Sequence, residues 1–119
     1  MNIALRQAMR IQGVLGVAVV DYVSRMTLGA LGSPDGLDLV RAANGETDVV
    51  RAKLSAMTLG GYRPEQLEDI LVTLDTEYHL IRPLNRRTHE GLFLYLVMER
   101  PLTDVEMVRK QLQQVERLL

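Results

Sequence analysis

The residues of this chain that could do chemistry are few and scattered. His79 and His89 are its two histidines, and it has no cysteine, which excludes disulfides, thiolate catalysis and cysteine-ligated zinc. No His-x-x-x-His pair is present, so a zinc site would need dispersed carboxylates. Ser24, His79 and Asp21 could be written as a catalytic triad, but no nucleophile-elbow pattern surrounds the serine. We therefore expect no enzymatic activity, metal or cofactor, and interpret His79 as a residue on the surface of a sheet.

Acidic residues lie at both ends of one strand-like segment. Glu68 and Asp69 stand near its beginning, and Asp75 and Glu77 follow its end. Such a group could bind a metal or act as an acid–base pair. The simpler interpretation is that these charges keep an exposed strand soluble and discourage wrong pairing.

Two further motifs have ordinary interpretations beside the functional ones. Arg86 and Arg87 could form an arginine finger or a phosphate clamp, or simply occupy a solvated turn. Gly13 and Gly16 precede a strand, whereas a phosphate-binding loop follows a strand and carries a lysine, so we interpret them as turn and packing residues.

Composition indicates a soluble globular chain of one domain, residues 1–119. The net charge of −1 provides no field for attracting nucleic acid. The longest apolar run, residues 14–20, is far shorter than the roughly 20 residues of a membrane helix. The first residues lack the pattern of a signal peptide. We expect a cytoplasmic protein with no nucleic-acid partner and no membrane insertion.

Strand patterns dominate the second half of the chain. Residues 67–74, 76–84 and 91–98 predict three consecutive antiparallel strands. Residues 91–98 are apolar at odd and even positions alike, so this strand is expected to be buried on both faces, at the centre of a sheet. Residues 14–22 have the same character and predict a second central strand, followed by an edge strand over 26–31.

Three helices are predicted around these strands, over residues 2–11, 37–59 and about 105–119. The middle helix, with Asp35 as its cap, is either continuous or broken at Asn44-Gly45, and Gly60-Gly61 ends it. The last helix begins with a capping-box pattern over residues 103–106. The residues of the middle helix that should face the sheet are Leu37, Val40, Ala43, Thr47, Val50, Leu54 and Met57.

Together these elements predict an α+β fold of order α-β-β-α-β-β-β-α. Its five-stranded antiparallel sheet would carry the long middle helix on one face and the two terminal helices on the other, because strands buried on both sides need cover on both sides.

One surface of this fold is predicted to be left uncovered. The strand at 67–74 would be an edge, and it is too apolar for an edge exposed to water. Beside it runs a flank of the middle helix that is half apolar and half charged. We interpret both as one self-association surface, the alternative being a monomer with an ordinarily apolar edge. The predicted interface residues are Leu39, Ala42, Glu46, Val49, Lys53, Ala56, Ile70 and Val72.

The chain resembles a bacterial member of the roadblock family, the dynein-light-chain-like small domains related to a gliding-motility GTPase-activating protein. The resemblance lies in residues 13–21, 49–54, 78–84 and 91–97, in the same order of elements. It implies a homodimer with joined edge strands and paired middle helices, which serves as a platform for a small Ras-like GTPase.

The leading hypothesis is therefore a cytoplasmic homodimeric adaptor without catalysis of its own. Its partner would contact Arg41 and Asp48 on the outward side of the middle helix. Two alternatives remain open: a small-molecule sensor module, and a subunit that pairs with a related roadblock protein. The sequence identifies neither the GTPase nor the pathway, nor whether GTP hydrolysis is stimulated.

Overall fold

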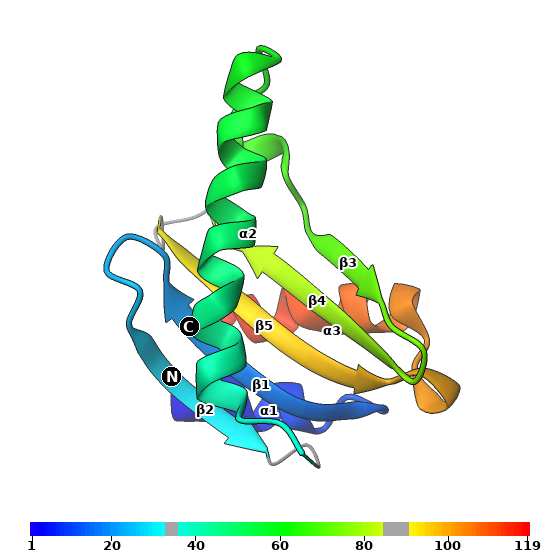
Figure 1. Cartoon of the computed structure of the whole chain (residues 1–119). Coiled ribbons are helices and arrows are strands. Elements are labelled where there is room, and N and C mark those ends of the chain that lie inside the picture. Colours follow the sequence, from blue (N-terminus) through cyan, green and yellow to red (C-terminus); the bar gives the residue numbers. More distant parts are fainter. Residues whose placement is uncertain (33–35, 85–90) are drawn as a thin grey trace.

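The computed structural model describes residues 1–32, 36–84 and 91–119, in which a five-stranded antiparallel sheet lies between two helical layers (Figure 1). The elements, in chain order, are α1 (Asn2–Met9), β1 (Val14–Asp21), β2 (Thr27–Gly32), α2 (Leu39–Leu59), β3 (Ile70–Thr73), β4 (Glu77–Pro83), β5 (Leu92–Glu99) and α3 (Val105–Arg117). Short 3-10 helices, η1 (Pro64–Gln66) and η2 (Arg100–Leu102), precede β3 and α3.

The strand order is β2-β1-β5-β4-β3, with all neighbours antiparallel. The predicted fold and the two predicted central strands are confirmed. Residues 16–20 of β1 and 93–98 of β5 are buried without exception. Because successive side chains of a strand point to opposite faces, this burial requires cover on both sides of the sheet.

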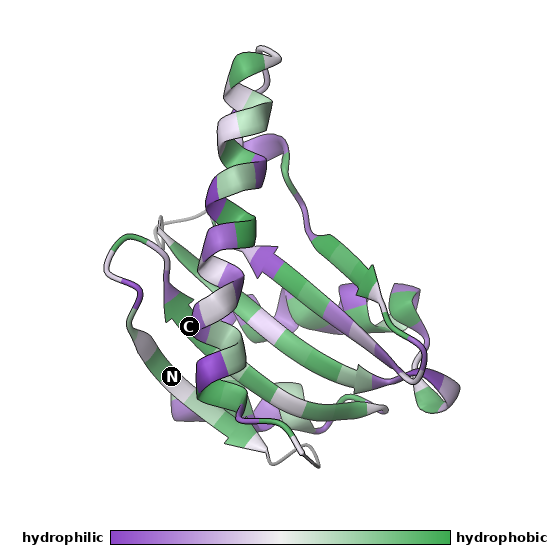
Figure 2. Cartoon of the chain, viewed as in Figure 1, coloured by the Kyte–Doolittle hydropathy of each residue, from purple (hydrophilic) through white to green (hydrophobic). Residues whose placement is uncertain are grey.

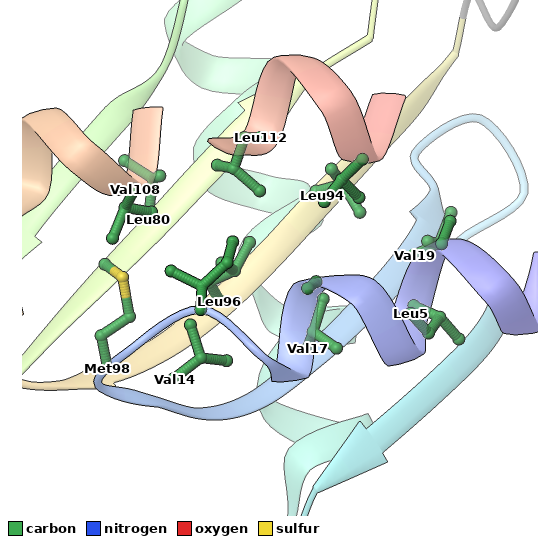
Figure 3. Packing of buried hydrophobic residues seen from close by; sticks show 14 of the residues in the cluster. Leu5, Val14, Val17, Val19, Leu80, Leu94, Leu96, Met98, Val108 and Leu112 are labelled. Carbon is green, nitrogen blue, oxygen red and sulfur yellow. The ribbon is translucent and has the colours of Figure 1, made fainter. Parts of the chain in front are cut away.

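The two terminal helices cover one face, as predicted. Figure 3 shows Leu5 of α1 and Leu112 of α3 packed over Val17 of β1 and Leu94 and Leu96 of β5. These side chains are almost completely removed from water. This face forms a continuous apolar core between the sheet and two helices.

The long helix α2 covers the other face. Ala43 and Val50 pack against Ala18, Phe93 and Tyr95 of the central strands. The helix is unbroken through Asn44-Gly45, and its end at Leu59 agrees with the prediction. In Figure 1 its C-terminal end projects beyond the strands, so part of the helix has no sheet beneath it.

The beginning of α2 differs from the prediction. The helix starts at Leu39, and its cap is Asp38, whose carboxylate accepts a hydrogen bond from the backbone N–H of Arg41. Asp35, the predicted cap, lies outside the described residues. Val40 was expected to face the sheet, but it is exposed, because Leu39, one turn before the buried Ala43, takes the inward position instead.

The starts of β3 and α3 also differ. The strand predicted from residue 67 begins at Ile70. The chain first forms η1, in which Gln66 accepts from the backbone N–H of Arg63, and residues 67–69 connect η1 to the strand. The predicted capping box before α3 is wrong. The Thr103 hydroxyl donates to the Glu99 carbonyl, and Asp104 is the cap instead.

Among the helices of the described segments, none has both the length and the apolar character needed to cross a membrane.

Candidate self-association surface

A narrow exposed stripe runs along α2, on the side turned toward β4 and β3. It consists of Ala42, Glu46, Val49, Lys53 and Ala56, hereafter the α2 seam, spaced four, three, four and three residues apart. This spacing keeps side chains on one line of a helix and is the spacing by which helices pack in coiled coils. All five retain exposure to solvent, with 41% of Val49 exposed. Figure 2 shows apolar and weakly polar residues along the projecting part of the helix.

The edge strand β3 presents an apolar surface next to this seam. Ile70 lies opposite Ile81 of β4, and Val72 lies opposite His79. Residues directly opposite in an antiparallel pair share a face. Ile81 belongs to the core under α2, so Ile70 and Val72 point to that same side. Within the described residues β3 pairs with β4 alone, which leaves its outer backbone groups open.

The seam and the β3 edge lie on one side of the molecule. Lys53 lines a groove of about 340 Å³ together with Leu67, which leads into β3. Nearer the start of the helix, Glu46 is close enough to His79 of β4 for their charges to interact. The structure therefore brings together the predicted residues of the middle helix and of the edge strand.

One predicted interface residue is misplaced. Leu39 is only 7% exposed and belongs to the core between α2 and the sheet. It was assigned to the exposed flank, but its side chain points inward from the first turn. The other seven predicted residues, Ala42, Glu46, Val49, Lys53, Ala56, Ile70 and Val72, retain partial or full exposure.

A polar cluster lies between the seam and the sheet. His79 accepts or donates through both ring nitrogens, with Nδ1 3.1 Å from the Tyr95 hydroxyl and Nε2 3.0 Å from a carboxylate oxygen of Glu77. Burial raises the pKa of Tyr95, and the negative charges of Glu46 and Glu77 raise it further. Burial also raises the pKa of Glu46, although the charge of His79 acts in the opposite direction. His79 is thus a bonded member of a cluster, on the sheet surface as predicted.

The predicted partner-binding residues lie on the outward side of α2. Arg41 and Asp48 are exposed and seven residues apart, about two helical turns. Asp48 forms an ion pair with Arg25, which the turn after β1 positions. In that turn Asp21 accepts hydrogen bonds from the backbone of Val23 and Ser24, and these bonds lower the pKa of Asp21.

The other chemical candidates are not assembled into a site. Asp21 accepts hydrogen bonds within the turn that contains Ser24, whereas His79 is hydrogen-bonded to residues of β4 and β5. The triad of Ser24, His79 and Asp21 therefore does not form. The described residues contain no group of three or more potential metal ligands. Arg86, Arg87 and His89 lie outside the described residues.

Sequence reasoning missed a buried ion network at the start of β3. Asp69 pairs with Arg109 of α3 and Arg82 of β4, and Arg82 also pairs with Glu116. Asp69 was interpreted as a solubilising charge, yet its side chain is only 7% exposed. The available signal was Arg82, which shares the inward-facing positions of its strand with Leu80 and Leu84 and therefore needs a buried partner.

A groove between η1 and α3, of about 560 Å³, lies beside this network. Its lining is almost entirely charged or amide-bearing: Gln66, Leu67, Glu68, Asp69, Glu106, Arg109, Lys110 and Gln113. Ligand sites for small molecules are usually mainly apolar, and the lining of this groove differs from that pattern.

The elements define a mixed α/β domain in which an edge strand lies beside an exposed stripe of the long helix. Over nearly its whole length the chain is similar to a number of solved structures, among them the following three. The Roadblock/LC7 domain from Streptomyces avermitilis has a TM-score of 0.77 at 11% identity, covering 99% of this chain and 92% of that one. MglB from Myxococcus xanthus has a TM-score of 0.75 at 14% identity, covering 97% and 84%. An MglB structure with a tetrameric arrangement has a TM-score of 0.80 at 15% identity, covering 99% and 83%.

The chain therefore has the roadblock fold, as the sequence predicted. No protein-family model matches the sequence. No curated protein matches it either.

Proposed function

We propose that this chain is a bacterial, cytoplasmic homodimeric adaptor that belongs functionally with the roadblock proteins. The observation that carries the proposal is the apolar β3 edge, which is unpaired on its outer side within the described residues, beside the α2 seam of apolar and charged side chains on the same side of the molecule. Two copies related by a two-fold axis pair their β3 edges and pack their seams antiparallel. Glu46 of one copy then meets the Lys53 of the second copy.

The physical argument is that both parts of this surface gain from the same contact. Edge pairing satisfies the open backbone groups of β3 and buries Ile70 and Val72. Seam packing covers the part of α2 that has no sheet beneath it, and alanines at positions 42 and 56 allow close approach of two helices. The tetrameric arrangement of an MglB supports self-association as a property of this fold.

The test is the oligomeric state. Sedimentation equilibrium of the purified chain at tens of micromolar should give a dimer. Val72→Lys should give a folded monomer, because it places a charge on the joined side of each edge. The matched control is Leu28→Lys, which adds the same charge to an exposed position of the opposite edge strand, β2. A monomeric wild-type chain, or a Val72→Lys variant that remains a dimer, contradicts the proposal.

The proposed partner of the dimer is a small Ras-like GTPase, bound without catalysis by the adaptor's own residues. The sequence resemblance to the roadblock family and the fold shared with MglB support this partner. Arg41 and Asp48 supply the contacts, since the exposed Asp48–Arg25 ion pair is weak enough to be exchanged for a pair with a partner.

A Ras-like GTPase encoded beside this gene is the first candidate to test. Calorimetric titration in the GDP and GTP-analogue states should detect binding, and Arg41→Glu should weaken it while leaving the dimer intact. Arg63→Glu, which reverses an exposed arginine beyond α2, is the control. Measuring GTP hydrolysis in the same mixtures decides whether the adaptor stimulates it. Wild-type affinity of Arg41→Glu would contradict the assignment of this site.

A further inference from the structure

A network of charged side chains attaches the start of β3 to the rest of the domain. Asp69 immediately precedes the strand, and its carboxylate accepts two hydrogen bonds from Arg109 of α3, at 2.9 and 3.0 Å. Arg82 of β4 lies 3.9 Å from the same carboxylate. Asp69 therefore connects three elements: the edge strand, its neighbour in the sheet and the helix behind the sheet.

Each arginine of this network has a second acidic partner. Arg82 also pairs with Glu116 of α3, and Arg109 also pairs with Glu106 at 2.9 Å. Asp69 and Arg82 are buried, whereas the Glu106 side chain is 78% exposed. The Arg109 side chain is 34% exposed, so the two pairs that hold β3 are less exposed than the Arg109–Glu106 pair. Less exposed pairs are less weakened by solvent and salt.

The strand itself has few other attachments. Of the strands, β3 is the shortest, with four residues, and it lies at the edge of the sheet. Its other contacts are the backbone ladder with β4 and the packing of two partly buried side chains, Leu71 against the core on the α1/α3 face and Ile70 against the core under α2. Short edge strands open more easily than central ones. An added strand needs an ordered template, because disorder in the edge must be lost before backbone pairing forms.

We propose that Asp69 is a positioning residue for the β3 edge: its ion pairs with α3 and β4 hold the strand in the geometry that a second copy pairs with. The consequence for assembly rests on the homodimer proposed above, whereas the effect on β3 does not. Contacts on α3 and association at β3 are thereby linked through Asp69.

The experiment compares Asp69→Asn with two controls. In Asp69→Asn, Arg82 keeps Glu116 and Arg109 keeps Glu106, so no arginine is left without an acidic partner and the fold is retained. Glu106→Gln removes a pair of the same Arg109 that does not reach β3. Val17→Ala lowers stability through a cavity in β1, which is not a neighbour of β3 in the sheet. Should Asp69→Asn not fold, Arg109→Gln removes the same pair while leaving Asp69 with Arg82.

Two measurements are made on each variant. Amide hydrogen exchange by NMR should speed up about tenfold or more at residues 70–73 in Asp69→Asn, with exchange in β5 unchanged. The dimer dissociation constant from sedimentation should rise by about tenfold or more. In Glu106→Gln and Val17→Ala, the exchange rates at residues 70–73 and the dissociation constant should both stay within about twofold of wild type, measured where each variant is fully folded.

Unchanged exchange at residues 70–73, or an equal rise in β5, overturns the proposal, since the first shows no role and the second only general destabilisation. Faster exchange in β3 with a wild-type dissociation constant overturns the link to assembly. A wild-type chain that is monomeric refutes the proposed homodimer, while the exchange data still decide whether Asp69 positions β3.

Discussion

The two faces of the sheet differ in how completely they are covered. On the α1/α3 face, two helices enclose an apolar core, and the charged side chains buried there are paired across elements. On the α2 face, one helix covers the central strands and leaves β3, part of β4 and its own seam accessible. That face holds the partly buried cluster around His79 and the buried hydroxyl of Thr47, which has no hydrogen-bond partner among the described residues. Both faces hold a buried core, but only the α2 face leaves a strand edge and a helix stripe accessible, and this is the surface at which we propose that a second copy adds.

Truncating one apolar side chain on each face should give the largest contrast in the free energy of unfolding. Leu112→Ala removes a fully buried side chain of α3 and should lower the free energy of unfolding by about 3 kcal/mol. Val49→Ala on the α2 seam should lower it by less than about 0.5 kcal/mol in the monomer. Urea denaturation at low protein concentration measures both. Equal losses would mean that the seam is already part of a packed interior.

A smaller effect of opposite sign is expected at Thr47. Its hydroxyl is buried and has no hydrogen-bond partner in the part of the chain that the structure describes, so Thr47→Val removes an unsatisfied polar group and keeps the shape. The free energy of unfolding should rise by about 1 kcal/mol. Thr58→Val is the control, because its hydroxyl already donates to the Leu54 carbonyl and should not gain from removal. A loss of stability in Thr47→Val would show that the hydroxyl is satisfied after all.

The smallest effect concerns the pH dependence of the α2 face. Burial raises the pKa of Glu46, so the folded chain holds this proton more tightly than the unfolded chain. Folding is therefore favoured at acidic pH, and this contribution is lost as pH rises through the raised pKa. Glu46→Gln should accordingly raise monomer stability at pH 7 relative to wild type, by less than about 1 kcal/mol, with no gain near pH 4. Denaturation curves of both proteins across this range, at low concentration, provide the measurement. A gain that is the same at every pH would exclude ionisation of Glu46 as its cause.

Much of the fold could be predicted because its signals are local. The strands β1 and β5 are apolar at every position except the last, Asp21 and Glu99, so their central place follows from neighbouring residues alone. The spacing of Val108, Leu112 and Val115 likewise predicts the buried side of α3, which the structure confirms. The candidate surface was predicted by the same reasoning, since an edge strand as apolar as residues 67–74 indicates an edge that something covers.

The wrong predictions concern residues whose partner is far away in the chain, or positions at which two neighbouring residues could take the same role. Thr103 and Asp104 are both good caps, and the choice depended on whether the Thr103 hydroxyl reaches Glu99. Leu39 follows the helical spacing of the seam, but it lies in the first turn, where the helix enters the core. No local pattern distinguishes these possibilities.

By itself, the sequence determined the order of the elements, the two central strands and the presence of an apolar edge, because hydrophobic periodicity records which faces of a strand or helix avoid water. Only the tertiary structure decided that the seam and β3 lie on the same side, and that Asp69 is buried. The partner of Asp69, Arg109, is 40 residues away, and a charge can be buried only where folding brings such a partner within reach.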